Sequence, residues 1–408
     1  MSGILVVGAG QAGFQAAASL RESGFAGPLT LVGEEAQPPY QRPPLSKAYL
    51  AGKTDARGLL LRQETFFAEH AITRRRARAT GIDRTERRVR LEDGQSLAYD
   101  HLILATGTRN RALPVPGADL AGVHGLRTLD EADALKSALE HARQIVVVGA
   151  GFIGLEFAAV CAARGLSVTV IEAADRVMAR AVSPETSAGF RDFHEASGVT
   201  ILFGAGVSAV EGADGRVASV TLADGKSLPA DLVLVGIGVV PNQELAEAVG
   251  LPVHDGIVVD AFLATADPAI SAIGDGARFP TRFAAGLPHG DRVRIESVQN
   301  AVDQGRCLAA RLTGRPSAYD AVPWFWSDQG PRTLQIAGLG SPGDASVLRR
   351  AGAGFSVFRF RDGRLSAVES VDRPADHMAA RRIIAAGRSL TPDQAADPAF
   401  DLKALATA

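Results

Sequence analysis

The chain has 408 residues, 46% of them hydrophobic, which is enough for large buried cores divided over two or three domains. Its formal net charge of -2 gives no overall electrostatic reason to bind nucleic acid or anionic lipid, so neither is an expected partner. No apolar stretch reaches the ~18 residues of a membrane span. A predicted strand begins within three residues of the N-terminus and leaves no room for a signal peptide. We therefore expect a cytoplasmic protein that does not engage a membrane.

The two cysteines, Cys161 and Cys307, lie far apart in the sequence and form no CxxC motif. Disulfide reductase chemistry of the thioredoxin or glutathione type is therefore disfavoured. An iron–sulfur cluster would need about four thiolates, so the chain carries none of its own. The eight histidines show no HxxxH or HExxH spacing, and we expect no metal site.

The first predicted element is a strand over residues 4–7, followed by Gly8, Gly10 and Gly13 in the spacing GxGxxG at the start of a helix. The first glycine allows a tight turn, the second lets a pyrophosphate approach the backbone, and the third lets the helix pack on the strand. Glu34 follows the next strand, where a carboxylate can accept hydrogen bonds from an adenosine ribose. The alternative is that Glu34 merely ends a surface strand. Taken alone, this motif is a weak indication of a dinucleotide site.

The same pattern occurs a second time. A strand over residues 145–148 precedes another GxGxxG loop, and a later strand runs into a second acidic residue at the matching distance. The residues of this copy are Gly149, Gly151, Gly154 and Glu172. Two copies in one chain predict two bound dinucleotides and an electron relay between them.

A second internal repeat supports the first. Asp93-Gly94 and Asp224-Gly225 each predict a hairpin turn, and each is followed by an apolar strand that ends on glycine, at Gly107 and Gly238. The chain therefore consists of two related halves and a remainder. Within the first half, the basic run at residues 74–78 is expected to be a solvated strand edge.

The predicted fold is α/β, with two doubly wound dinucleotide-binding domains and a C-terminal α+β domain. The proline-rich stretch at 113–117 and Pro241-Asn242 mark the breaks. Residues 256–275 lack a glycine loop of their own and should complete an existing domain. In the last domain, strands at 355–360 and 365–371 flank an Arg-Asp-Gly turn, and a helix covers 375–386. The predicted domains are residues 1–113 with 244–323, residues 114–243, and residues 324–408.

Seven motifs, spread from the N-terminus to the last domain, give the chain a family resemblance. They are Pro43-Pro44-Leu45-Ser46-Lys47, Leu104-Ala105-Thr106-Gly107, Gly151-Phe152-Ile153-Gly154-Leu155-Glu156, Gly236-Ile237-Gly238-Val239-Val240-Pro241-Asn242, Ala272-Ile273-Gly274-Asp275, Glu296-Ser297-Val298-Gln299-Asn300-Ala301 and Trp324-Phe325-Trp326-Ser327-Asp328-Gln329. The chain resembles the glutathione-reductase-like flavoproteins, and in particular the FAD-containing NADH:ferredoxin reductases of bacterial monooxygenase and dioxygenase systems. One departure is Gly276, where many relatives have cysteine.

The resemblance implies two sets of binding residues. FAD would contact Gly8, Gly10, Ala12, Gly13, Glu34, Lys47, Ala79, Thr106, Gly107, Arg127, Asp275, Val298 and Trp326. NAD would contact Gly149, Gly151, Gly154, Glu156, Glu172 and Gly238. It also implies that Asp275 bonds a ribityl hydroxyl, and that Val298 begins a helix whose free N–H groups face the flavin ring where reduction places negative charge.

Lys47 and Glu156 are the implied catalytic residues. The resemblance places the lysine beside the flavin N5 edge and the glutamate next to where nicotinamide stacks, as an ion pair. The alternatives are an exposed lysine and an acid in the first turns of a helix. Trp326 could equally be part of an interdomain core, and Arg127 a surface ion-pair partner.

The implied activity is hydride transfer from NADH to FAD, followed by single-electron transfer to a [2Fe-2S] ferredoxin. The ferredoxin would dock transiently and electrostatically, with Arg306 and Arg62 as candidate contacts. A rubredoxin or quinone reductase would share nearly every motif, because the choice of acceptor depends on the surface. A redox signalling flavoprotein like apoptosis-inducing factor uses the same fold, so it also remains an alternative.

Overall fold

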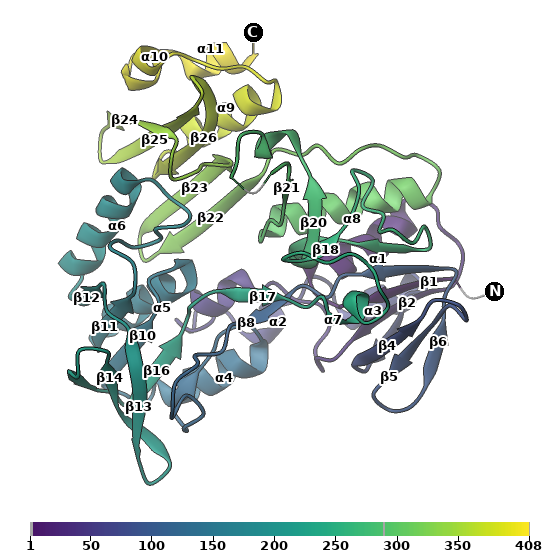
Figure 1. The fold of residues 1–408 in the computed structure, drawn as a ribbon, viewed down its shortest axis with the longest axis horizontal. Helices are drawn as coiled ribbons and strands as arrows, with labels where there is room; N and C mark the ends of the chain where they lie inside the picture. The colour runs from purple at the N-terminus through teal and green to yellow at the C-terminus, as the bar shows by residue number, and fades with distance from the viewer. Residues whose placement is uncertain (1–2, 289, 408) are drawn as a thin grey trace. The chain divides into compact units, whose positions relative to one another are not determined.

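The computed structural model describes residues 3–288 and 290–407 (Figure 1). Its contacts divide the chain into two compact units. Unit 1 comprises Met1–Gln41, Leu60–Arg109 and Val240–Phe325. Unit 2 comprises Arg42–Leu59, Asn110–Val239 and Trp326–Ala408. Within the described residues, no helix is both long and apolar enough to cross a membrane.

Unit 1 is built on a parallel five-stranded sheet in the order β19-β7-β1-β2-β3. The strands are β1 (Ile4–Val7), β2 (Leu29–Gly33), β3 (Thr73–Arg76), β7 (His101–Leu104) and β19 (Ile270–Ala272). Val7 lies opposite both Val32 and Leu104, so the central strands end at the same edge. β3 is an edge strand, as expected, and carries three of the four arginines of the basic run, but Arg74 and Arg75 are half-buried and only Arg76 is exposed there. Of residues 256–275, β19 joins this sheet, whereas residues 257–258 pair with residues 277–278 in a separate small sheet of the same unit.

Helices α1 (Gln11–Glu22) and α8 (Val298–Leu312) pack against each other beside this sheet. Their backbones approach closely at Gly305, where a β-carbon would lie 3.0 Å from the backbone nitrogen of Ala16. The other elements of unit 1 are α3 (Glu64–Glu69), β4 (Ala79–Asp83), β5 (Arg88–Leu91), β6 (Ser96–Ala98), α7 (Glu244–Glu247), β18 (Ile257–Val258), η2 (Gly274–Gly276), β20 (Ala277–Pro280), η3 (Arg282–Ala284) and β21 (Arg292–Val293).

Unit 2 repeats the same plan with a parallel sheet in the order β12-β11-β10-β16-β9. Its strands are β9 (Val123–His124), β10 (Gln144–Val148), β11 (Ser167–Glu172), β12 (Val199–Phe203) and β16 (Leu232–Val235). The helices are α4 (Leu129–Ala138), α5 (Phe152–Ala163) and α6 (Pro184–Ala196), and the antiparallel strands are β13 (Val207–Ala213), β14 (Arg216–Leu222) and β15 (Ser227–Pro229). Val148 lies opposite Ile171 and Val235, which matches the register around Val7. The predicted repeat is confirmed.

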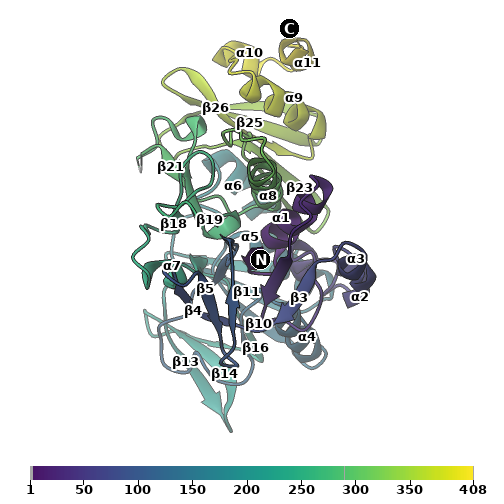
Figure 2. The same cartoon turned by 90° about the vertical axis from the view of Figure 1, so that its right-hand side faces the viewer.

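The C-terminal part of unit 2 is an antiparallel sheet in the order β22-β23-β26-β25-β24, with helices at the C-terminal end of the chain (Figure 2). Its elements are β22 (Trp324–Gln329), β23 (Arg332–Gly338), β24 (Ala345–Ala351), β25 (Gly354–Arg361), β26 (Arg364–Val371), α9 (Pro374–Ala385), α10 (Pro392–Ala396) and α11 (Leu402–Thr407). The turn between β25 and β26 has positive φ at Asp362 and Gly363, as the Arg-Asp-Gly sequence predicted.

Three parts of the chain lie at or across the unit boundaries. β8 (Thr108–Asn110) and β17 (Val239–Pro241) contain two of these boundaries. The segment Arg42–Leu59, with η1 (Pro43–Ser46) and α2 (Ala56–Leu59), makes its contacts within unit 2. The sequence placed this segment in the first domain, and the finer division into three domains stays a prediction.

Candidate active site

The first glycine loop joins the end of β1 to α1. Gly8 has a φ of +111°, and a β-carbon there would overlap the carbonyl oxygen of Ala105. A β-carbon at Gly13 would overlap the carbonyl oxygen of Gly8, so the fold itself requires both glycines. At Gly10, by contrast, a β-carbon would meet no protein atom within 4 Å. The space beside Gly10, at the N-terminus of α1, is therefore open to a ligand.

The second loop, between β10 and α5, has the same construction. Gly149 has a φ of +103°, and its β-carbon would lie 2.5 Å from the carbonyl oxygen of Gly236. A β-carbon at Gly154 would overlap the carbonyl oxygen of Gly149. The nearest protein atom to a β-carbon at Gly151 is 3.9 Å away. Both loops therefore have room for a phosphate at the middle glycine, where helix N–H groups favour an anion.

The acidic residues of the two motifs, Glu34 and Glu172, lie at the ends of β2 and β11, as predicted, but they differ in their contacts. Glu34 follows β2 and is exposed. Glu172 is the last residue of β11, and its two carboxylate oxygens accept hydrogen bonds from the backbone N–H groups of Ala150 (2.7 Å) and Ala174 (2.8 Å). Glu172 thus braces the second glycine loop, a role that the sequence did not indicate.

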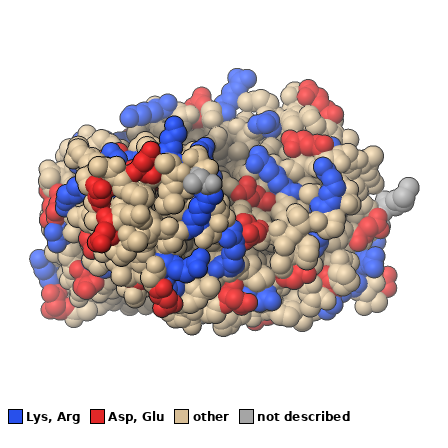
Figure 3. All heavy atoms as spheres, turned by 90° about the horizontal axis from the view of Figure 1, so that it is seen from above, with Lys and Arg blue, Asp and Glu red and all other residues tan. Residues whose placement is uncertain are grey.

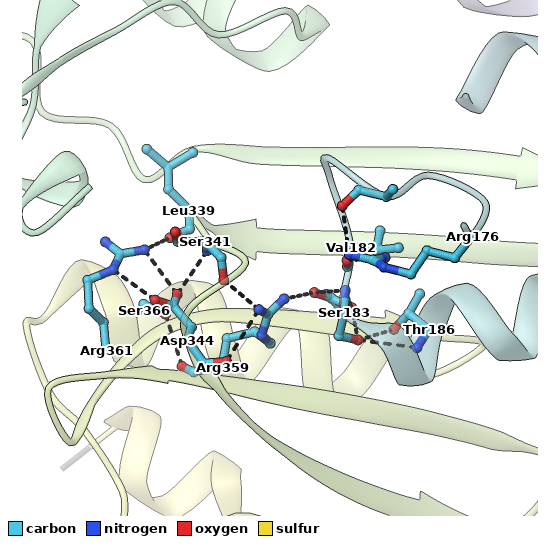
Figure 4. A network of polar contacts seen from close by, with 12 residues as sticks. Arg176, Val182, Ser183, Thr186, Leu339, Ser341, Asp344, Arg359, Arg361 and Ser366 are labelled. Carbon is cyan, nitrogen blue, oxygen red and sulfur yellow. Dashed lines mark hydrogen bonds and ion pairs between the residues drawn. The ribbon is translucent and has the colours of Figure 1, made fainter. Parts of the chain in front are cut away.

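Arg176 lies four residues beyond Glu172, where a cation could favour a 2′-phosphate. Its guanidinium instead donates to the carbonyl oxygens of Val182 (2.9 Å) and Ala179 (2.7 Å) in its own loop (Figure 4). These bonds direct the charge of Arg176 into the protein. At the end of β11, where the ribose is predicted to bind, the charged side chain is therefore the carboxylate of Glu172 and not the guanidinium of Arg176.

Asp275 belongs to η2, which lies between α1 and α8 in unit 1. Gly274 has a φ of +77°, and a β-carbon there would lie 2.7 Å from the β-carbon of Ala12 in the glycine motif. The Gly274 N–H also donates to the side chain of Gln304 on α8 (2.7 Å). The fold thus brings the Asp275 turn and the first glycine loop together.

Two further predictions concern the edge of the same sheet and the start of α8. The Thr106 hydroxyl donates to the carbonyl oxygen of Asn242 (2.6 Å), and the Asn242 side chain returns a bond to the Thr106 carbonyl (2.9 Å). Thr106 and Gly107 are thereby held in place. Val298 is the first residue of α8, after the capping residue Ser297, so its N–H lies among those without an acceptor inside the helix.

The remaining predicted FAD residues divide between the units. Ala79 is half-buried at the start of β4 in unit 1. Lys47, Arg127 and Trp326 belong to unit 2. The backbone of Arg127 accepts a bond from Arg42 (2.5 Å) and donates one to Glu131 (2.6 Å). Contact of these residues with FAD, like that of Gly238 with NAD, stays a prediction.

Lys47 and Glu156 form the predicted ion pair, with 2.8 Å between Nζ and Oε2. The lysine side chain is 18% exposed and the glutamate 4%. Glu156 also accepts hydrogen bonds from the hydroxyls of Ser46 (2.5 Å) and Ser327 (2.6 Å). A buried carboxylate is tolerated only when it is paired and hydrogen-bonded, and here a cation and two hydroxyls supply the partners. The alternative of a fully exposed Lys47 is excluded.

The segment that carries Lys47 is anchored on α4 and α5 of the same unit. The Tyr49 hydroxyl donates to Asp133, and Arg164 donates to the carbonyl oxygen of Leu50. Burial, followed by the bond to Asp133, raises the pKa of Tyr49 to about 12, so the phenol stays protonated as a donor. These contacts hold the segment that carries Lys47 in place within unit 2, which contains the second glycine loop.

A family described as pyridine nucleotide-disulphide oxidoreductase matches residues 2–305, and one described as reductase C-terminal matches residues 324–406. The chain belongs to the pyridine nucleotide-disulphide oxidoreductases. Within this family, the chain is 54% identical over 403 residues to rhodocoxin reductase of Rhodococcus erythropolis, covering 98% of this chain and 93% of that protein.

Two solved structures share the whole fold with this pyridine nucleotide-disulphide oxidoreductase. The ferredoxin reductase for the CYP199A2 system from Rhodopseudomonas palustris is 49% identical, has a TM-score of 0.95, and matches over 100% of each chain. The reductase in the covalent putidaredoxin reductase–putidaredoxin complex is 39% identical, has a TM-score of 0.94, and covers 100% of this chain and 98% of that one.

The cofactor of this pyridine nucleotide-disulphide oxidoreductase is FAD, and its substrate is a nicotinamide nucleotide. The residues present fit both groups, because each glycine loop leaves open space where a pyrophosphate would lie. The thiols, in contrast, do not fit disulphide chemistry. Burial raises the pKa of Cys161 to about 12 and also raises that of Cys307, and both are free. In the described part of the chain, no three His, Cys, Asp or Glu side chains gather as metal ligands.

Proposed function

We propose that this chain is a reductase that takes a hydride from NADH onto FAD and delivers single electrons to a [2Fe-2S] ferredoxin serving an oxygenase. The observation that carries the proposal is the pair of glycine loops, each with open space at its middle glycine. Bound FAD accepts a hydride and can release electrons one at a time. The relatives of this chain include reductases of ferredoxins, which favours a ferredoxin as the acceptor.

The chain's own residues bind and orient the two nucleotides. Gly10 admits FAD to unit 1, and Gly151 admits NADH to unit 2. Lys47 would hold a positive charge beside the bound flavin, and Glu156 keeps that ammonium in one place. Hydride transfer between two bound rings needs proximity and alignment and no nucleophile, so orientation is the main task of these residues.

The acceptor would dock on a surface of unit 1 that includes Arg306 and Arg62. The Arg306 side chain on α8 is 64% exposed, and its nearest acidic partner, Asp303, is 4.0 Å away. Arg62 is exposed, with its guanidinium 5.7 Å from the ring centroid of Phe66. Lysines and arginines are interspersed with acidic residues over the face shown in Figure 3, so any steering of an acidic ferredoxin must be local.

Anaerobic stopped-flow mixing tests the proposal. NADH should reduce the bound flavin, and the reduced enzyme should then reduce putidaredoxin, used as a probe ferredoxin, faster than it reduces a rubredoxin or a soluble quinone. Preference for either of the last two acceptors would replace the ferredoxin in the proposal. Slow turnover with all three would favour a signalling flavoprotein. We also propose that the enzyme acts in the cytoplasm, where NADH is produced and consumed.

A further inference from the structure

A line of buried hydrogen bonds continues from Glu156 in the direction away from Lys47. The Ser327 hydroxyl lies 2.6 Å from Oε1 of Glu156, and the side-chain nitrogen of Gln329 lies 3.3 Å from the Ser327 hydroxyl. The Gln329 oxygen lies 2.8 Å from Nε2 of His194. Ser327, Gln329 and His194 are all fully buried. These bonds link β22 and α6 to the catalytic ion pair within unit 2.

The chemistry of the groups gives every bond in this line the same direction. A carboxylate can only accept, so Ser327 must donate its single hydrogen to Glu156. The Ser327 oxygen then accepts from the Gln329 amide, whose second hydrogen points to the sulfur of Met178 at 3.5 Å. A flipped amide would direct its oxygen at Ser327, which has no hydrogen left to give. The Gln329 oxygen therefore faces His194 and accepts from its Nε2–H.

His194 ends the line as a neutral donor. Burial lowers the pKa of His194, so the imidazole carries a single proton near neutral pH. That proton resides on Nε2, because this nitrogen faces an acceptor. Nδ1 is buried and has no hydrogen-bond partner within the described residues. The line thus runs as a series of aligned donors from His194 to the negative charge of Glu156, in which each bond polarises the next.

We infer that Ser327 is a positioning residue that holds the Glu156 carboxylate in place for Lys47, and that Gln329 and His194 orient Ser327. With Lys47 and Ser46 on Oε2 and Ser327 on Oε1, the carboxylate is held from both sides. Without the Ser327 hydroxyl, a buried oxygen of the carboxylate would lose its donor, and the carboxylate would be free to turn and carry the ammonium with it. This inference rests on the proposed role of Lys47 beside the flavin.

The test compares FAD-loaded Ser327→Ala with a matched control, Ser356→Ala. Ser356 is also a fully buried serine of the C-terminal sheet, but its hydroxyl bonds Ser370 and Asp376. Ser327→Ala should slow flavin reduction by NADH about tenfold, the loss expected for a hydrogen bond to a charged group, and should shift the flavin midpoint potential. Ser356→Ala should behave as wild type. Ser327→Ala with an unchanged rate and potential, or an equal change in both variants, would overturn the inference.

A double-mutant cycle with Lys47→Met separates positioning from a general structural effect. If Ser327 acts through Lys47, then in the Lys47→Met background Ser327→Ala should change the rate of flavin reduction less than about twofold and should leave the midpoint potential unshifted. If Ser327→Ala slowed flavin reduction by the same factor in the wild-type and Lys47→Met backgrounds, its role would be structural and the inference would be contradicted. Lys47→Met alone reports on the proposed function, since wild-type behaviour of that variant would remove the lysine's role and the inference together. Gln329→Met should have a smaller effect than Ser327→Ala, and a larger one would contradict the order of the line.

Discussion

Gly10 and Gly151 occupy equivalent positions in the two halves of the chain, and each is the glycine of its loop whose missing side chain leaves open space. A β-carbon at Gly10 would meet nothing within 4 Å, and one at Gly151 would meet only the Gly236 carbonyl oxygen, at 3.9 Å. Their neighbours Gly8 and Gly149 have positive φ and no such space. Substitutions at the middle glycines should therefore affect ligands and leave the fold intact.

The first prediction assigns the two nucleotides. Gly10→Val should yield a folded, colourless apoprotein, because the side chain fills the space of the FAD pyrophosphate. Gly151→Val should remain yellow and lose NADH affinity by about a hundredfold, as expected for blocked phosphate contacts. Gly343→Val, at an exposed glycine with open space, is the control. Flavin absorbance and NADH titration provide the readouts, and the reverse pattern would mean that the two sites are exchanged.

A second prediction concerns the lysine at the flavin. Lys47→Met should keep FAD bound, because the glycine loop of unit 1 is unchanged, but should shift the flavin potential and slow hydride transfer about tenfold or more, in line with the loss of a charged group near the reacting ring. Lys53→Met replaces an exposed lysine of the same segment and should have no effect. Potentiometry and stopped-flow reduction by NADH check the result. A wild-type flavin potential and a wild-type rate of reduction in Lys47→Met would contradict this prediction.

Nicotinamide choice is the third prediction. NADH should be preferred over NADPH, because a 2′-phosphate would meet the Glu172 carboxylate while Arg176 is held by its own loop. Glu172→Ala should narrow the ratio of kcat/KM for the two nucleotides about tenfold, which is roughly 1.4 kcal/mol. It also removes an acceptor for the Ala150 N–H. Glu172→Gln keeps one acceptor oxygen without the charge and should narrow the ratio as well. Comparable wild-type values for NADH and NADPH would contradict this prediction.

Docking of the acceptor is the fourth prediction. Ferredoxin reduction should slow as ionic strength rises, and Arg306→Glu should raise the KM for putidaredoxin about tenfold, because it reverses an exposed charge on α8. NADH:ferricyanide turnover should stay intact in this variant. Arg57→Glu, at an exposed arginine of α2 in unit 2, is the matched control. Salt-independent kinetics with an unaffected Arg306→Glu enzyme would place the partner elsewhere.

The fifth prediction concerns acid stability. Burial, followed by the charge of Arg311, lowers the pKa of His101 to about 4. The folded state therefore holds His101 neutral between pH 4 and 6.5, while the unfolded chain protonates it, so stability falls as pH drops through this window. The loss attributable to this group is on the order of 3 kcal/mol at its limit. His101→Gln should flatten the pH dependence of denaturant unfolding in that range, and an unchanged slope would contradict the assignment.

The sequence predicted the parts of the fold that depend on local pattern. Glycine spacing and strand hydrophobicity placed both loops, and the Asp-Gly turns placed the repeated hairpins. The pairing of Lys47 with Glu156 followed from a family resemblance and is confirmed in geometry, while its role stays a prediction.

Long-range side-chain contacts could not be predicted in this way. Residues 42–59 join unit 2 because of bonds such as Tyr49 to Asp133, between positions 84 apart. Ser327 lies 171 residues from Glu156, and no periodicity encodes such a bond. Ser327 and Gln329 follow the two tryptophans of a recognisable motif, but nothing in the sequence distinguishes a buried serine or glutamine from an exposed one in that strand.

The interleaving of the two units along the chain sets the order in which they can be completed during synthesis. Unit 1 needs residues up to Phe325, and unit 2 needs the segments after it as well as Arg42–Leu59 from near the start. Neither unit can finish folding while most of the chain is still on the ribosome. Lys47 is synthesised long before Ser327, so the Glu156 carboxylate between them acquires its full set of bonds only after Ser327 has emerged from the ribosome. The ion pair between Lys47 and Glu156 can form earlier, but the complete set of bonds to this carboxylate is a late product of synthesis.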